Sequence, residues 1–194
     1  GRLIKNTTLL SALNILFGFP APIILALLIN EVRNNRFKRT VQTVTYLPHF
    51  ISVVIVCSLL RLFFASGGLV NDLFGTNIDF FNKEEWFRPL YILSGIWQEI
   101  GWGSIVYLSA LTAIDQELYE AATIDGANSL QRLKAVTIPM VTPVIFYNLL
   151  MGVIGLMQFF LTPMVLNNGN GFPNGMTNFP MVYFYRQAFS YFNM

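Results

Sequence analysis

The stretch Thr7–Asn30, TTLLSALNILFGFPAPIILALLIN, contains no Asp, Glu, Lys or Arg. An α-helix needs about 20 mainly apolar residues to cross the hydrocarbon core of a bilayer, so this stretch predicts a membrane span. Two further stretches, 40–60 and 135–185, are also free of charged residues. Only 11% of the 194 residues are charged, against roughly 25% in an average soluble domain. The composition therefore indicates a multi-pass membrane protein.

The distribution of charge between these stretches predicts five spans and their orientation. The spans are expected at residues 7–30, 46–65, 89–114, 141–165 and 181–194. The first connection holds Arg33, Arg36, Lys38 and Arg39 against the single acid Glu31. Cytoplasmic loops of membrane proteins carry an excess of Lys and Arg, so this connection and the one at 115–140 are placed inside. We expect one all-α membrane helix bundle over residues 1–194, and we expect it to be a fragment of a longer chain.

The cytoplasmic connection carries the most informative motif. It reads Glu120-Ala121-Ala122-Thr123-Ile124-Asp125-Gly126-Ala127, and Val136-Thr137-Ile138-Pro139 follows. Gly126 permits a sharp turn, and Ser129 is expected to cap a second short helix that runs through Val136. The segment therefore predicts a helix-turn-helix. Its alanines allow another surface to approach closely, and its charged residues suit a polar protein partner.

This segment resembles the Glu-Ala-Ala loop of permease subunits in binding-protein-dependent ATP-binding cassette importers. That pattern has three residues between the last Ala and a Gly, and nine residues between this Gly and Ile-x-Leu-Pro; here Val136 stands for the Ile and Ile138 for the Leu. The resemblance implies a MetI-like permease fold with a coupling helix that docks in a cleft of a cytoplasmic ATPase subunit. The coupling residues that it implies are Glu120, Ala121, Ala122, Asp125, Gly126, Ala127, Ile138 and Pro139.

Three other segments resemble the carbohydrate-importer branch related to the maltose permeases: Tyr46-Leu47-Pro48, Gly67-Gly68-Leu69-Val70-Asn71 and Trp97-Gln98-Glu99-Ile100-Gly101-Trp102. The resemblance implies a sugar or oligosaccharide as the solute and a bacterial-type plasma (inner) membrane as the location. It also implies a second, related permease subunit and an extracytoplasmic solute-binding protein.

The sequence also limits the chemistry of the chain. A phosphate-binding Walker loop needs Gly-Lys followed by Ser or Thr, but the four lysines are followed by Asn, Arg, Glu and Ala. ATP hydrolysis is therefore expected in separate subunits, and the chain is not expected to be an enzyme. With one His and one Cys, no metal site, catalytic site or cofactor is predicted. A dispersed net charge of +2 gives no reason to expect nucleic-acid binding.

A solute path is predicted in the third span, at Gln98, Glu99 and Trp102. Aromatic faces stack on sugar rings, while amides and carboxylates bond to hydroxyls. Helical spacing places Gln98 and Trp102 on one face and Glu99 elsewhere. Glu99 could instead form a structural hydrogen bond to a neighbouring helix, or carry a proton in an ion-coupled secondary transporter, which is the rival function. His49 is interpreted as a helix-end group.

Overall fold

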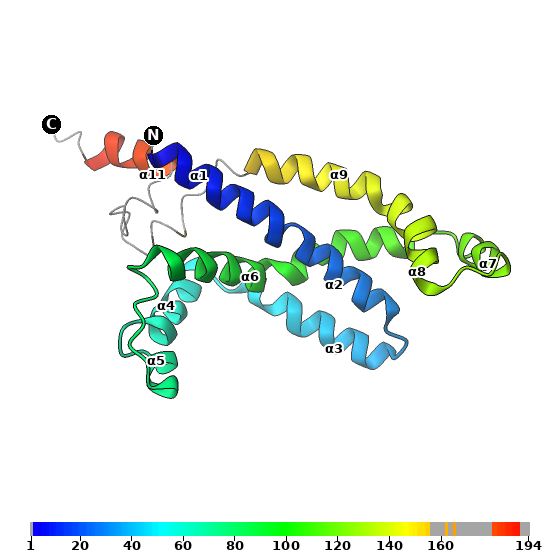
Figure 1. The fold of residues 1–194 in the computed structure, drawn as a ribbon, viewed down its shortest axis with the longest axis horizontal. Coiled ribbons are helices and arrows are strands. Elements are labelled where there is room, and N and C mark those ends of the chain that lie inside the picture. The colour runs from blue at the N-terminus through cyan, green and yellow to red at the C-terminus, as the bar shows by residue number, and fades with distance from the viewer. Residues whose placement is uncertain (1, 156–161, 163–164, 166–179, 191–194) are drawn as a thin grey trace. The chain divides into compact units, whose positions relative to one another are not determined.

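The computed structural model describes residues 2–155, 162, 165 and 180–190, and every element within these residues is helical (Figure 1). The elements that position the functional segments are α1 (Arg2–Leu13), η1 (Asn14–Gly18), α2 (Pro20–Glu31), α3 (Asn35–Tyr46), η2 (Leu47–Phe50), α4 (Val53–Phe64), α5 (Leu69–Phe74), α6 (Glu84–Thr112), α7 (Gln116–Ile124), α8 (Ser129–Arg132), η3 (Leu133–Thr137), α9 (Ile138–Gly155), α11 (Pro180–Tyr185) and η5 (Arg186–Ser190). The predicted all-α fold is confirmed.

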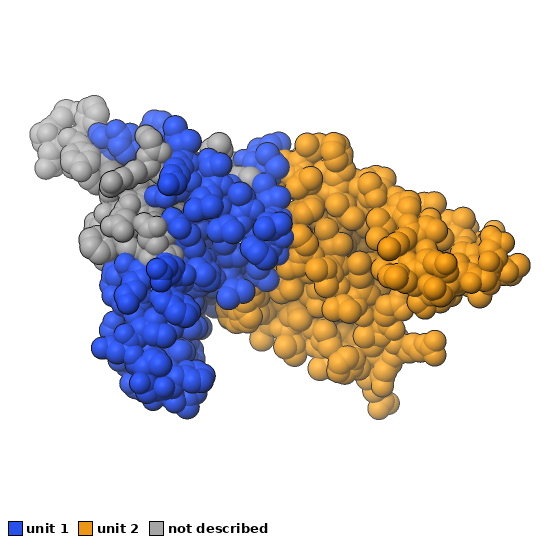
Figure 2. All heavy atoms as spheres, viewed as in Figure 1, with its two compact units in different colours: residues 1–18, 50–96, 153–194 blue, residues 19–49, 97–152 orange. Residues whose placement is uncertain are grey.

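The chain divides into two units, which Figure 2 shows in different colours. Unit 1 comprises residues 1–18, 50–96 and 153–194. Unit 2 comprises residues 19–49 and 97–152, and it holds the Glu-Ala-Ala segment and the predicted solute-path residues. Each unit has its own buried apolar side chains.

Three helices among the described residues are long and apolar enough to cross a membrane: Ile4–Glu31, Val53–Phe74 and Ser129–Gly155. They overlap the predicted first, second and fourth spans. The predicted third span lies in α6, which is helical but is not among these three, so its assignment as a span stays a prediction. The fifth span also stays a prediction: α11 and η5 cover residues 180–190, and residues 191–194 lie outside the described residues. Residues 156–161, 163 and 164 of the predicted fourth span lie outside the described residues as well.

The connection between the first two predicted spans, residues 31–45, was interpreted as a loop, but it is mostly helical, because α3 begins at Asn35. The Asn34 side chain accepts hydrogen bonds from the backbone N–H groups of Arg36 and Phe37, at 3.0 and 3.2 Å, and so satisfies donors that a helix start leaves unpaired. Pro48 has no N–H to continue the helical ladder, and the chain passes through the short turn η2. Ser52 then caps α4, so this helix begins seven residues after the predicted start at residue 46.

Wider π-helical turns precede the prolines of two long helices. The turn η1 ends at Gly18, just before Pro20, and η3 ends at Thr137, just before Pro139. A proline ring inside a regular α-helix clashes with the carbonyl four residues earlier. A π turn bonds five residues back, as Ile138 N–H does to the Leu133 carbonyl, and it shifts the backbone ahead of the ring. The helix therefore continues through Pro139 into α9.

Unit 2 is built around α2, α3, α9 and the second half of α6 (Figure 1). Its core consists of the buried side chains of Ala26, Ile29, Tyr107, Leu108, Leu111, Ile114 and Val141. Two glycines of α6 allow the close approach of neighbouring helices. A Cβ on Gly101 would overlap the backbone carbonyl of Thr45 in α3, and a Cβ on Gly103 would lie 3.1 Å from the Pro22 ring in α2. Glycine at 101 is therefore a packing requirement.

In unit 1, the Gly67-Gly68-Leu69-Val70-Asn71 segment organises the loop after α4. The buried Asn71 amide donates to the carbonyls of Ala65 and Ile78, at 3.1 and 2.9 Å. Its oxygen accepts from the Ile78 N–H and the Thr76 hydroxyl, both at 2.9 Å. An amide with every partner satisfied fixes the irregular stretches on both sides of α5, the short helix in which Asn71 lies. This gives a structural reason for asparagine at this position.

Candidate functional site: the helix-turn-helix of α7 and α8

The Glu-Ala-Ala segment forms the helix α7. Asp115 caps its start, where the carboxylate accepts a hydrogen bond of 3.0 Å from the Glu117 N–H. Glu117 in the first turn adds negative charge near the positive end of the helix dipole. The motif residues Glu120 and Ala121 follow in the middle of this helix.

Gly126 ends α7 in a Schellman motif. It adopts a left-handed conformation with φ of 78°. Its N–H donates to the Thr123 carbonyl at 3.0 Å, and the Ala127 N–H donates to the Ala122 carbonyl at 2.9 Å. These bonds satisfy carbonyls that the helix end leaves unpaired, and the positive φ strains any residue that carries a Cβ. The glycine of the motif is therefore required by the turn itself.

Asn128, and not Ser129, caps the second helix, so the predicted cap is corrected by one residue. The Asn128 side chain accepts from the Gln131 N–H at 3.0 Å, and the Gln131 side chain accepts from the Asn128 N–H at 2.8 Å. This reciprocal capping box satisfies two donors at once. The predicted end at Val136 is also wrong, because the helix runs from Ser129 to Gly155.

Side chains tie α7 to the start of this long helix. The Arg132 guanidinium donates to the Thr123 hydroxyl in α7 at 3.1 Å and to the Ser129 hydroxyl at 3.2 Å. Tyr119 and Thr137 form a hydrogen bond of 3.0 Å between their hydroxyls, and Thr137 is buried. The Tyr119 ring also packs against the unit 2 core. Several side-chain contacts therefore link α7 to the helix that continues as α9.

The predicted coupling residues differ in exposure. Glu120, Ala121, Asp125 and Gly126 are exposed, as are Ile138 and Pro139, whereas Ala122 and Ala127 are half-buried. The most exposed large apolar side chain of α7 is Ile124, at 87%. An apolar side chain in that position, flanked by acids, suits a protein partner better than water. The sequence motif alone did not single out Ile124, although it lies within the quoted segment.

Removing the Tyr119 hydroxyl tests the link between the two helices. Tyr119→Phe is expected to lower the stability of the protein by about 1 kcal/mol, because the buried Thr137 hydroxyl then loses its hydrogen bond to Tyr119. Thermal unfolding in detergent measures the change. Tyr147→Phe is the control, because this exposed tyrosine in α9 makes no hydrogen bond within the described residues. Equal stabilities of the two variants would contradict the link.

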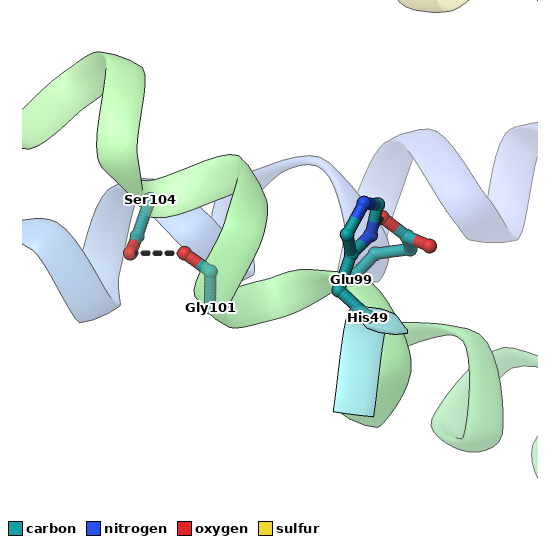
Figure 3. Close-up of polar contacts among 4 residues, drawn as sticks. All are labelled: His49, Glu99, Gly101 and Ser104. Atoms are coloured by element: carbon teal, nitrogen blue, oxygen red, sulfur yellow. Dashed lines mark hydrogen bonds and ion pairs between the residues drawn. The ribbon is translucent and has the colours of Figure 1, made fainter. Parts of the chain in front are cut away.

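A second cluster in unit 2 brings together residues fifty positions apart. The imidazole Nδ1 of His49, at the end of η2, lies 3.0 Å from a carboxylate oxygen of Glu99 (Figure 3). The His49 ring stacks on the Trp102 indole, with centroids 4.4 Å apart and planes within 1°. The Glu99 side chain is 57% exposed and that of His49 is 29% exposed. An acid, an imidazole and an aromatic face therefore lie together on one accessible surface.

This cluster corrects two interpretations of the sequence. Helical spacing separated Glu99 from Trp102, but His49 contacts both of them. His49 is also more than a helix-end group, since its ring joins two residues of α6. Gln98 is half-buried, and Ser104 of the same helix is buried and donates to the Gly101 carbonyl at 2.6 Å. No group of three or more His, Cys, Asp or Glu suited to a metal occurs in the described part of the chain.

The similarity to known proteins extends over most of the chain. The family described as "Binding-protein-dependent transport system inner membrane component" matches residues 18–192. The polygalacturonan/rhamnogalacturonan transport system permease protein YteP of Bacillus subtilis (strain 168) is 53% identical over 148 residues, which cover 74% of this chain and 46% of that protein. The lactose transport system permease protein LacF of Rhizobium radiobacter is 32% identical over 181 residues, covering 89% of this chain and 61% of that protein. This chain thus spans roughly half the length of these relatives.

The fold is also similar to a solved structure. A crystal structure of a bacterial ABC transporter involved in the import of the acidic polysaccharide alginate contains a chain that is 39% identical, with a TM-score of 0.91. The match covers 99% of this chain and 68% of that one. A family match over most of the sequence agrees here with a close match in structure. The chain therefore belongs to the family of binding-protein-dependent transport system inner membrane components, has the MetI-like permease fold, and is a multi-pass membrane protein.

Proposed function

We propose that this chain is part of the transmembrane permease subunit of an ATP-binding cassette importer for sugars or oligosaccharides. The observation that carries the proposal is the exposed helix-turn-helix of α7 and α8, which continues without a break into a helix long enough to cross the membrane. A docking element joined rigidly to a span can convert motion of a cytoplasmic partner into motion of the membrane domain. The names of the relatives support a carbohydrate as the solute.

The proposed mechanism is alternating access driven from outside the chain. A cytoplasmic ATPase subunit binds the α7 surface around Glu120, Ala121 and Ile124, and its closure on ATP displaces α7. The Schellman turn and the Arg132 and Tyr119 contacts carry that displacement into α9. A second permease subunit and an extracytoplasmic solute-binding protein complete the importer. In support, a relative of known structure has been crystallised in complex with an alginate pentasaccharide-bound periplasmic protein.

Transport in sealed vesicles tests this function against the rival ion-coupled transporter. The full-length subunit is reconstituted with its ATPase and second permease, and the solute is supplied on its binding protein. Uptake is expected with ATP and no ion gradient. Uptake that follows an ion gradient in the absence of ATP would reject the importer and favour the secondary transporter.

Within this function we infer that Gln98, Glu99 and Trp102 contribute to the solute path, together with His49. The inference is supported by the exposed Trp102 face and by the polar groups of His49 and Glu99 beside it. Apolar ring faces combined with a few convergent polar groups are typical of small-molecule sites.

Two tryptophans of α6 provide a matched pair for testing the path. Trp97 and Trp102 are 47% and 45% exposed, but only Trp102 stacks on His49. Loss of one stacking face is expected to lower ATP-driven sugar uptake about 2- to 10-fold in Trp102→Ala. Trp97→Ala is expected to transport at nearly the wild-type rate. If the two variants transport equally well and both still assemble with the ATPase, Trp102 does not line the solute path.

A further inference from the structure

The corner between α2 and α3 carries a concentrated positive charge. Arg33, Arg36, Lys38 and Arg39, which we term the basic corner, lie within seven residues that contain no acid. Three of them are exposed and Lys38 is half-buried. None of the four side chains makes an ion pair or hydrogen bond to another residue in the part of the chain that the structure describes. No described residue therefore neutralises these charges.

The basic corner lies directly beyond a membrane-spanning helix. The apolar helix Ile4–Glu31 ends two residues before Arg33, and α3 then turns back to pack against α2 and, at Thr45, against α6 (Figure 1). Such a position, at the cytoplasmic end of a span, is the level of the lipid headgroups. Arg and Lys side chains there extend along the helix to place their charge among phosphate groups.

The apolar residues of α3 also indicate that this helix lies at the level of the lipid headgroups. Phe37 is 57% exposed although it sits among the basic residues, and Val44, two turns later on the same side of the helix, is also exposed. An aromatic ring beside arginines is typical of helices that lie at the boundary between headgroups and acyl chains. Val41, four residues after Phe37 on the same apolar stripe, packs against the unit 2 core, so the stripe is covered at its middle and exposed at Phe37 and Val44.

Charge distinguishes this surface from the docking helix of the same unit. The α7 region carries the exposed acids Asp115, Glu117, Glu120 and Asp125. In Figure 1, α7 lies further to the right than the turn between α2 and α3. An acidic surface is repelled by an anionic membrane, whereas a basic one is attracted to it. The two cytoplasmic surfaces of unit 2 therefore suit different partners.

We propose that the basic corner binds the phosphate groups of anionic phospholipids in the cytoplasmic leaflet, with Phe37 inserted beside them. Two bound headgroups fit four cations, and the arginine forks suit phosphate oxygens in pairs. The lipid then holds the α2–α3 corner at a fixed depth. This binding is independent of the solute and of ATP, so it does not depend on the proposed importer function.

The test uses the assembled full-length transporter in an uncharged detergent. Short-chain phosphatidylglycerol or phosphatidylcholine is titrated in, and thermal unfolding reports binding. Phosphatidylglycerol is expected to raise the melting temperature and phosphatidylcholine is not. Removing two charges with Arg36→Gln/Arg39→Gln is expected to weaken the apparent affinity for phosphatidylglycerol about 10- to 30-fold. The matched control is Lys5→Gln/Lys83→Gln, which removes the same charge from exposed lysines elsewhere and is expected to keep the wild-type affinity.

Five outcomes would overturn the proposal. Equal affinity in the two double variants would show that only net charge matters. Equal stabilisation by the two lipids, or persistence of the effect at about 1 M salt, where the screening length is about 3 Å, would exclude a headgroup interaction. Stabilisation by inorganic phosphate to the same level would indicate a free-anion site, and loss of ATPase co-purification in Arg36→Gln/Arg39→Gln would indicate a protein partner.

Discussion

Gly101→Ala is expected to destabilise the membrane domain by about 3 kcal/mol, near the upper end of what overpacking usually costs. The glycine faces the backbone of α3, and an added Cβ would overlap the Thr45 carbonyl, a group that cannot rotate away as a side chain could. The helices α3 and α6 must therefore separate. Such separation also moves His49, which follows α3, away from Glu99 and Trp102. The measurement is the melting temperature of the assembled transporter, together with the yield of folded protein.

Gly95 provides the control for this substitution. It lies in the same helix, and a Cβ there would meet nothing within 4 Å. Alanine favours a helix by up to about 1 kcal/mol over glycine, so Gly95→Ala is expected to be neutral or slightly stabilising. Gly103→Ala should be intermediate, because only the Pro22 ring opposes the new methyl group. If Gly101→Ala and Gly95→Ala have the same melting temperature, α3 and α6 are not in close contact.

The all-α class could be predicted from the sequence because the absence of charge and the length of the apolar stretches both indicate segments that cross a bilayer. Backbone groups in lipid must bond internally, so long charge-free stretches such as Thr7–Asn30 become helices. The same reasoning failed over residues 31–45, where basic residues suggested a loop. The helix signal was present, however: Asn34 is a strong cap, and Phe37, Val41 and Val44 follow it at helical spacing. Charge thus predicts where a chain meets water more reliably than where a helix ends.

The candidate site was predictable only where its contacts are local. The pair Asn128 and Gln131 has the spacing of a capping box and could have replaced Ser129 as the expected cap. Gly126 was identified correctly as the turn residue, because a left-handed turn needs glycine. The contact of Glu99 with His49 joins residues fifty positions apart and has no local signal. Close approach at Gly101 likewise depends on a neighbouring helix, so the sequence alone does not distinguish it from the open Gly95.

Gly126→Val is expected to reduce ATP-driven uptake about tenfold or more, within the usual range of coupling free energies. A left-handed conformation costs an L-residue roughly 1–2 kcal/mol, and a β-branched side chain more. The chain relieves this strain by giving up the two Schellman hydrogen bonds, which set the angle between α7 and α8. The docking helix then no longer moves with α9. We therefore expect ATPase binding or hydrolysis to persist while solute uptake is lost, as measured in reconstituted vesicles.

The turn after α5 provides a control that separates this loss of coupling from a general loss of stability. Gly75 also ends a helix in the left-handed conformation, with φ of 60°, and it too has open space around a new Cβ. Gly75→Val therefore introduces a similar backbone strain away from the α7–α8 segment. Both variants should melt at lower temperatures than the wild type, but only Gly126→Val should uncouple hydrolysis from uptake. If Gly75→Val uncouples equally, the effect arises from destabilisation, and α7 then has no special role in transmitting the ATPase motion.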